Sequence, residues 1–213
     1  MEKNSEGRNN KKKVIGIINY GFGNIPSLKN ALDYLGYKSV IINKPENPKK
    51  YTHIMLPGDG FFPKAAEVLR KKKWDSFIKN ALNEDKKLLG ICVGMQLLFS
   101  HSSEGSGSEG LGIIKGNCDK FNNNKNYSIP HIGFNFVNFN NFNSEFRKNT
   151  GYFYFIHSFR VKKIREKDIL IANSFYGEEF VAFINKKNIF GAQFHPEKSG
   201  THGLSLIKNF LDC

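Results

Sequence analysis

The stretch that decides the fold is Leu88-Leu89-Gly90-Ile91-Cys92-Val93-Gly94-Met95-Gln96-Leu97-Leu98-Phe99. A short apolar run typical of a buried strand leads into Gly-x-Cys-x-Gly, and a helical pattern follows. This is the form of a nucleophile elbow, in which glycines let the chain turn sharply and leave the Cys92 side chain exposed at the bend. Unpaired N–H groups in the first helical turn favour a negatively charged sulfur. We interpret Cys92 as a candidate nucleophile; the alternative is a buried structural cysteine between two packing glycines.

A second set of reactive groups stands near the C-terminus. The segment Asn188 to Phe194 has the pattern of a strand, and His195-Pro196-Glu197 follows it. Pro196 ends the strand, and side chains two residues apart in an extended chain point the same way. Glu197 can therefore orient the His195 imidazole, and with Cys92 the three groups form an activated-nucleophile triad. A His-x-Glu sequence alone is more often a surface pair, so the catalytic interpretation depends on the elbow.

Strand and helix signals alternate along the first half of the chain. We expect strands at Val14 to Asn19, Ser39 to Ile42, His53 to Leu56 and Leu88 to Ile91, and helices at Ser27 to Leu35, Lys64 to Arg70 and Trp74 to Leu82. This alternation predicts an α/β fold: a doubly wound, mostly parallel sheet with helices on both faces. Short strands and turns from Gly112 to Ile184 predict a smaller, mostly antiparallel extension. Asn19, Pro57, Cys92 and His195 all end strands, which places them at the edge where ligands bind in such sheets.

Composition limits the remaining possibilities. The chain of 213 residues is expected to form one domain over 14–213, after a disordered basic leader over 1–13. Three widely spaced cysteines suit a reducing cytoplasm and argue against a disulfide framework or a zinc site. No apolar run reaches the roughly 18 residues of a membrane span. The net charge of +13 comes from scattered lysines without a nucleic-acid motif, so we expect a solvated basic surface and no nucleic-acid partner.

A third element can serve the candidate nucleophile. The run His53-Ile54-Met55-Leu56 ends in Pro57-Gly58-Asp59-Gly60, a strand followed by a glycine-rich turn. Such a loop can present backbone N–H groups to a developing negative oxygen, which is usually the largest single catalytic contribution. By itself Pro-Gly-x-Gly is only a turn signal.

Together these elements resemble the class I glutamine amidotransferases. Within that family the chain is most similar to the glutaminase subunits of imidazole glycerol phosphate synthase, an enzyme of histidine biosynthesis. The resemblance runs from about Val14 to Leu211 and rests on motifs that occur in order: Asn19-Tyr20-Gly21-Phe22-Gly23-Asn24, Gly90-Ile91-Cys92-Val93-Gly94-Met95-Gln96, Ser103-Glu104-Gly105, Pro130-His131-Ile132-Gly133-Phe134-Asn135, Tyr154-Phe155-Ile156-His157-Ser158 and His195-Pro196-Glu197-Lys198-Ser199-Gly200.

The resemblance implies hydrolysis of L-glutamine to glutamate and ammonia by Cys92, His195 and Glu197, without metal or organic cofactor. It assigns oxyanion stabilisation to Val93 and to the loop with Asp59 and Gly60. It assigns the glutamine pocket to Gly60, Gln96, Glu104, Ser158 and Phe159. Glu104 could pair with the α-ammonium group; the alternative is a solvated loop carboxylate.

The resemblance also implies a partner. Subunits of this kind form a heterodimer with a (β/α)8-barrel cyclase, which receives the ammonia and controls glutaminase activity. Contact residues by similarity are Asn24, Phe134, Asn135 and Lys198, although Lys198 could equally be a free lysine after the catalytic strand.

Three positions depart from the family pattern. Phe134 replaces a tryptophan, Phe159 a tyrosine, and Asp59 a small apolar residue. A carboxylate at Asp59 would oppose an oxyanion unless it faces solvent or is paired. The departures leave open a paralogous subunit that supplies ammonia for acetamidino-sugar synthesis in surface glycans. Two further alternatives are an inactive binding or regulatory module and a cysteine peptidase of the same superfold.

Overall fold

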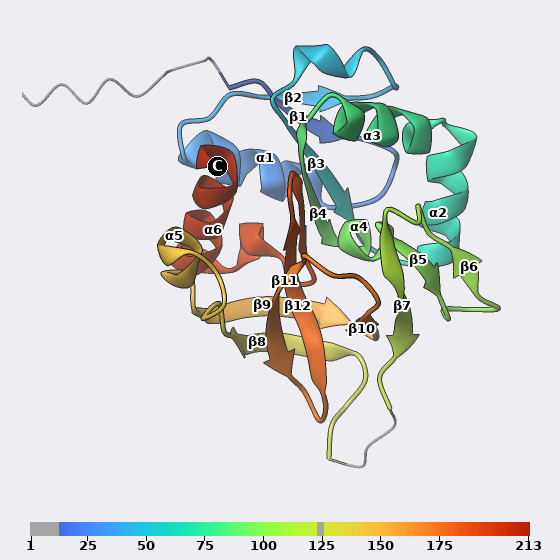
Figure 1. Cartoon of the computed structure of the whole chain (residues 1–213), viewed down its shortest axis with the longest axis vertical. Helices are drawn as coiled ribbons and strands as arrows, with labels where there is room; N and C mark the ends of the chain where they lie inside the picture. Colours follow the sequence, from blue (N-terminus) through green and yellow to red (C-terminus); the bar gives the residue numbers. More distant parts are fainter. Residues whose placement is uncertain (1–12, 123–125) are drawn as a thin grey trace, which may run out of the picture.

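A computed structural model describes residues 13–122 and 126–213 (Figure 1). Most of the expected leader, residues 1–12, lies outside this described part. Lys13 is described, and its ammonium group pairs with Asp212 in the C-terminal helix. Among the described residues, no helix is both long and apolar enough to cross a membrane.

Five parallel strands form the half of the main sheet that carries the elbow. Their order is β2 (Ser39–Ile42), β1 (Ile15–Ile18), β3 (His53–Gly58), β4 (Lys87–Cys92) and β13 (Ile189–Ala192). The central strands are almost wholly buried, as expected of a parallel sheet covered on both faces. The central position of β4, between β3 and β13, brings Cys92 between the glycine-rich loop and the strand that leads to His195.

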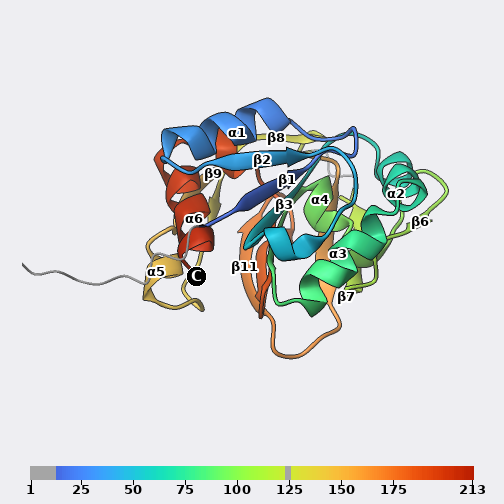
Figure 2. The ribbon, with the colours of Figure 1, turned by 90° about the horizontal axis from the view of Figure 1, so that it is seen from above.

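Helices cover both faces of the parallel strands. In Figure 2, α1 (Ile25–Tyr34) and α6 (Gly200–Asp212) lie on one side, and α2 (Phe62–Lys71) and α3 (Trp74–Asn83) lie on the other. Asn24 begins α1, since its side-chain oxygen accepts the N–H of Ser27 at 3.1 Å. The predicted doubly wound α/β architecture is confirmed.

The antiparallel extension is confirmed as well, but it continues the main sheet instead of standing apart from it. From β13 the sheet continues through antiparallel pairings, and the last part contains one further parallel pair, between β5 and β7. The strands involved are β12 (Glu179–Lys186), β10 (Phe159–Ile164), β7 (Ile114–Lys120), β5 (Phe99–Ser102) and β6 (Ser108–Glu109), with β11 (Leu170–Phe175) paired to β12.

A separate two-stranded sheet contains β8 (His131–Val137) and β9 (Gly151–His157). The short helix α5 (Ser144–Arg147) connects these two strands. Phenylalanines fill the space behind them, with Phe153 and Phe194 ring centroids 4.1 Å apart. This packing holds β9 against the segment that carries His195, where the His195 N–H donates to the Tyr154 carbonyl at 2.9 Å.

The helix after the elbow is shorter than its apolar pattern indicates. α4 spans only Val93–Gln96, and Phe99 already belongs to β5. Leu97, Leu98 and Phe99 are buried by tertiary packing in a turn and a strand, so their helical spacing does not reflect a longer helix. Two single-turn helices, η1 (Pro48–Lys50) and η2 (Pro196–Lys198), complete the described elements.

Candidate active site

Cys92 is both the last residue of β4 and the N-cap of α4. Its backbone has φ 55° and ψ −115°, a conformation rare for a residue with a side chain, and only 3% of its surface is exposed. Such strain costs about 1–3 kcal/mol and persists only where the surrounding structure imposes it. The sharp turn expected from the sequence is therefore present, with the strain on the cysteine itself. The Cys92 side chain is buried and not exposed as expected, because the segments with Ile156 and Gln193 pack against its sulfur.

The two glycines of the elbow serve close packing, not a left-handed turn. Gly90 and Gly94 have no positive φ among the described backbone angles. A Cβ atom on Gly94 would lie 1.9 Å from the Leu56 carbonyl oxygen, and one on Gly90 would lie 2.6 Å from the Gly94 oxygen. A side chain at Gly94 would push the elbow off β3, and one at Gly90 would push α4 off β4.

His195 and Glu197 are joined as expected. Nδ1 of His195 lies 2.8 Å from Oε1 of Glu197, and both side chains are almost fully buried. Nε2, the other ring nitrogen, is buried and has no hydrogen-bond partner among the described residues. Burial lowers the pKa of His195, but the Cys92 sulfur and the Glu197 carboxylate outweigh it and raise that pKa to about 10. Nε2 is thus placed to hold a proton taken from Cys92.

The hydroxyl of Ser199 fixes the histidine from behind. It donates to the His195 carbonyl at 2.6 Å and accepts the Tyr154 N–H at 2.9 Å. These bonds hold the turn after β13 against β9, so the imidazole stays above the sulfur. Ser199 belongs to a quoted motif, but nothing in the sequence identified this role.

A cavity of about 300 Å³ opens above Cys92 and brings the predicted site residues together. Its lining contains, from the prediction, Asp59, Gly60, Cys92, Val93, Gln96, Glu104, Ser158, Phe159 and His195. Glu197 lies behind His195 and is not part of the lining. Pro130, Ile156 and His157 complete the wall and were not predicted as site residues.

The candidate oxyanion groups meet beside the sulfur. Gly58 lies opposite Cys92 in the pairing of β3 with β4, and Asp59 and Gly60 follow it at the mouth of the cavity. Val93 is the first residue of α4, so its N–H has no intrahelical acceptor. The Asp59 carboxylate is paired, because its Oδ1 accepts the Gly23 N–H at 2.8 Å. This bond fastens the glycine-rich loop to the loop that precedes α1.

Glu104 is anchored at the start of α2. Its Oε2 accepts the Phe62 N–H at 2.8 Å, and among the described residues the other carboxylate oxygen has no hydrogen-bond partner, so it is available to a ligand in the cavity. Burial raises the pKa of Glu104, although the Phe62 N–H opposes the shift. A cation beside it would restore the charged form.

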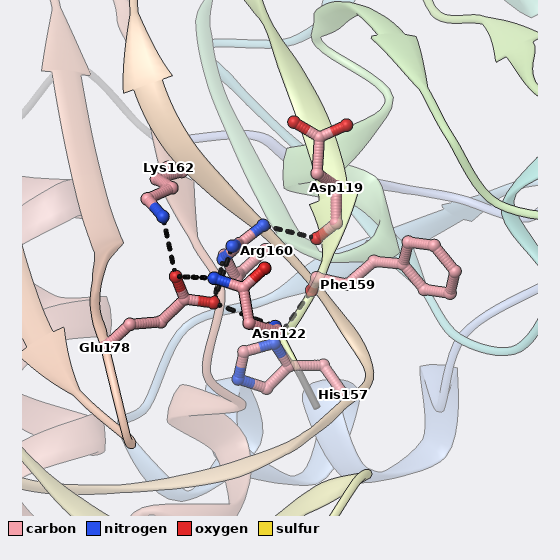
Figure 3. A network of polar contacts seen from close by, with 7 residues as sticks. All are labelled: Asp119, Asn122, His157, Phe159, Arg160, Lys162 and Glu178. Atoms are coloured by element: carbon pink, nitrogen blue, oxygen red, sulfur yellow. Dashed lines mark hydrogen bonds and ion pairs between the residues drawn. The ribbon is translucent and has the colours of Figure 1, made fainter. Parts of the chain in front are cut away.

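A buried polar network includes the Phe159 carbonyl, and sequence analysis missed it; Figure 3 draws the contact of this carbonyl with His157. The Phe159 carbonyl accepts from Gln96 Nε2 at 2.9 Å and from His157 Nδ1 at 2.8 Å. Burial lowers the pKa of His157 to about 3, so the ring is neutral and its Nε2 accepts from His131 Nδ1 at 3.1 Å. Both histidines stand in quoted motifs, yet their pairing depends on the register of β8 with β9.

Arg160 follows Phe159 in β10, and its own hydrogen bonds anchor this part of the strand, as Figure 3 shows. Its guanidinium donates to the Glu178 carboxylate at 2.6 Å and to the Asp119 carbonyl at 2.8 Å. Burial raises the pKa of Glu178, but hydrogen bonds from Lys162, Asn122 and Arg160 outweigh it and leave the pKa below its usual value. The network holds the Phe159 wall of the cavity in place.

The expected partner-contact residues lie on adjoining elements. Asn24 precedes α1, which packs beside η2 with the exposed Lys198, and η2 in turn packs beside β9. Phe134 is exposed on β8, whereas Asn135 points to the opposite side and donates to the Phe175 carbonyl at 2.7 Å. The alternation of side chains along a strand therefore separates the two neighbouring residues.

Comparison with known proteins agrees with this geometry. The family Glutamine amidotransferase class-I matches residues 16–213. The imidazole glycerol phosphate synthase subunit HisH of Caldanaerobacter subterraneus is 44% identical over 199 residues, which cover 92% of this chain and 97% of the relative. The subunit of the same name from Bacillus velezensis is 39% identical over 202 residues, covering 92% and 95%.

Solved structures share the fold. PurLQS of Thermotoga maritima superposes with a TM-score of 0.74 at 20% identity, covering 94% of this chain and 98% of that one. A crystal structure of a glutamine amidotransferase gives a TM-score of 0.71 at 17% identity, covering 93% and 97%. The strained cysteine, its histidine–glutamate pair and the family match over nearly the whole described chain lead to one conclusion: this chain belongs to the class I glutamine amidotransferases.

Proposed function

We propose that this chain is the glutaminase subunit of an imidazole glycerol phosphate synthase and hydrolyses L-glutamine to glutamate and ammonia. The observation that carries the proposal is the cavity in which Cys92, His195, Gln96 and Glu104 converge, with Glu197 bonded to His195 from behind. The similarity to subunits of that name over most of the chain supports the pathway.

The reaction begins with attack of the Cys92 sulfur on the side-chain amide carbon of glutamine. The thiol proton passes to Nε2 of His195, the nitrogen that has no protein partner, and Glu197 stabilises the resulting imidazolium. The Val93 N–H and one N–H of the loop around Gly60 stabilise the tetrahedral oxyanion. His195 then gives its proton to the departing ammonia, and water hydrolyses the thioester to release glutamate.

Two side chains recognise the amino-acid end of glutamine. The free oxygen of Glu104 accepts from the α-ammonium group, and the ion pair counteracts the burial of the carboxylate. Gln96 uses its Nε2 within the protein, toward Phe159 and Gln193, so its oxygen is the atom available to a donor on the ligand. Phe159 lines the cavity at the position where the family has tyrosine, so it supplies an apolar wall without a hydroxyl.

The partner is a (β/α)8-barrel cyclase subunit, docked on the outer face of β8 and β9. Large apolar side chains alternate there and are 42% to 59% exposed: Ile132, Phe134, Phe136, Tyr152 and Ile156. An exposed patch of this kind beside a cavity is typical of a protein–protein interface. Ile156 also lines the cavity, so a docked subunit would sit where ammonia leaves.

Acetamidino-sugar synthesis is the alternative pathway, raised by the departures at Asp59, Phe134 and Phe159. The hydrogen bond from the Gly23 N–H to Asp59 weakens the part of this alternative that rests on Asp59, because it ties the carboxylate to the loop before α1. An inactive module is disfavoured because the triad is assembled.

Two assays test the proposal. Cys92→Ala should abolish glutamine-dependent synthesis by the chain with its barrel cyclase and leave ammonia-dependent synthesis intact. Loss of both reactions would indicate damage to folding or docking, and retention of both would exclude Cys92 as the nucleophile. Growth of a histidine-requiring strain supplied with this chain and its barrel subunit would exclude a role limited to sugar amidination.

A further inference from the structure

Gln193 is a buried amide that no step above uses. It follows β13 directly, is 0% exposed, and its N–H donates to the Ala182 carbonyl at 2.8 Å. Because it lies two residues before His195 in extended chain, its side chain is on the side of the strand that faces the elbow. An amide in this position must find partners for its polar atoms or destabilise the fold.

A chain of hydrogen bonds fixes the direction of this amide. The Phe159 carbonyl can only accept, so the atom of Gln96 that faces it at 2.9 Å must be Nε2. The same Nε2 lies 3.0 Å from Gln193, which must therefore present Oε1. The Nε2 group of Gln193 is left facing the Cys92 sulfur at 3.9 Å. The Phe159 carbonyl thus sets the direction of every hydrogen bond in this series and leaves the Gln193 amide group as a donor beside the sulfur.

We propose that Gln193 stabilises the reactive, negatively charged form of the Cys92 sulfur by donating a hydrogen bond to it. This inference rests on the proposed function only for the choice of Cys92 as nucleophile. The proton still moves from the sulfur to Nε2 of His195, and Gln193 neither gains nor loses one. Since charge-assisted hydrogen bonds are about twice as strong as neutral ones, the amide favours the thiolate over the thiol.

Other groups that face the sulfur act alongside Gln193. His195 supplies the cation, and the Ile156 carbonyl, 3.9 Å away, accepts from the thiol form. Tyr20, buried beside Cys92, and the cavity residues Asp59 and Glu104 complete the surroundings. Among the described residues, Gln193 is the one uncharged side chain that donates a hydrogen bond to the sulfur. It can therefore be removed without changing any charge.

The test measures alkylation of Cys92 by iodoacetamide as a function of pH, on the full chain without its partner. Mass spectrometry of the Cys92 peptide separates this residue from Cys118 and the exposed Cys213. Gln193→Met keeps the length of the side chain and removes the donor. We expect the alkylation midpoint to rise by about one pH unit, so the rate at pH values below the wild-type midpoint should fall about tenfold.

Gln193→Glu is the matched variant, because it keeps the shape and the oxygen that accepts from Gln96. Its carboxylate replaces the donor by a like charge, so the midpoint should rise further than in Gln193→Met. The plateau rate at high pH is the internal control, since every variant is then fully ionised. An unchanged plateau with a raised midpoint supports the proposal, whereas a changed plateau with an unchanged midpoint indicates only a structural role and overturns it.

If Gln193→Met fails to fold, Gln193→Leu, which also removes the donor without adding a charge, replaces it. An unchanged midpoint in a folded Gln193→Glu protein would overturn the proposal. Glutamine hydrolysis, measured in parallel with the barrel cyclase, separates the two ideas. Raised midpoints in the variants, together with a wild-type chain that never hydrolyses glutamine, would support the hydrogen bond and refute the glutaminase function.

Discussion

Glu197→Gln changes one atom of the triad and leaves its shape unchanged. Nδ1 of His195 lies 2.8 Å from the Glu197 carboxylate, and both side chains are shielded from solvent, so little screening weakens their interaction. Cys92 and Glu197 together overcome burial and raise the pKa of His195 from 6.5 to about 10. If the carboxylate supplies about half of this rise, its loss removes roughly 2 kcal/mol at 1.36 kcal/mol for each pKa unit.

We therefore expect kcat for glutamine hydrolysis to fall at least about 30-fold in Glu197→Gln. If the amide also selects the wrong imidazole tautomer, the loss approaches roughly 10⁴-fold, as in other triads. KM should change little, because Glu197 does not line the cavity. The assay is glutamate release by the chain with its barrel cyclase. Glu67→Gln, an exposed change on α2, is the control and should match wild type.

The pH profile gives the sign of the effect. His195 holds its proton below about pH 10 and loses it above, so activity that needs the imidazolium falls on the alkaline side. Without the Glu197 carboxylate the pKa of His195 is lower, and this alkaline limb moves to lower pH. A kcat within about twofold of wild type, with an unmoved alkaline limb, would refute the assigned role of Glu197.

Three further changes test other parts of the site. Glu104→Gln should raise KM for glutamine about 10- to 100-fold through loss of a charge-assisted bond, and an unchanged KM would remove Glu104 from recognition. Gly94→Ala should lower the melting temperature by roughly 5–10 °C, since its Cβ would lie 1.9 Å from the Leu56 oxygen; an unchanged thermal scan would contradict the packing argument. Phe134→Asp should leave that temperature near wild type and weaken binding of the cyclase about tenfold or more in a titration; unchanged affinity would place the interface elsewhere.

Local signals predicted the parallel half of the fold well. Ser39–Ile42 is a strand with the expected bounds, because a β-branched run between turn residues has few other solutions. The elbow was predictable because strand, Gly-x-Cys-x-Gly and helix signals occur together. The length of α4 was not, since Leu97 to Phe99 satisfy a helical spacing while tertiary contacts place them in a turn and a strand.

The site was predictable where a residue acts through its own motif, and not where two distant segments meet. His195 and Glu197 are neighbours in sequence, so their pairing could be expected. Gln193 stands in the same segment, but its partner Gln96 is nearly a hundred residues away and only the pairing of β4 with β13 brings them together. A lone amide in an apolar strand, two positions before a candidate histidine, was the one signal that pointed to it.

The central claim is that this chain hydrolyses glutamine for a barrel cyclase. The most direct measurement is glutamate release from glutamine by the chain alone, and then with its organism's barrel cyclase and that subunit's nucleotide ligand. Strong stimulation by the pair, lost in Cys92→Ala, is the expected result. No glutamate release with a folded, ligand-bound partner would contradict the account and direct attention to the sugar-amidination pathway.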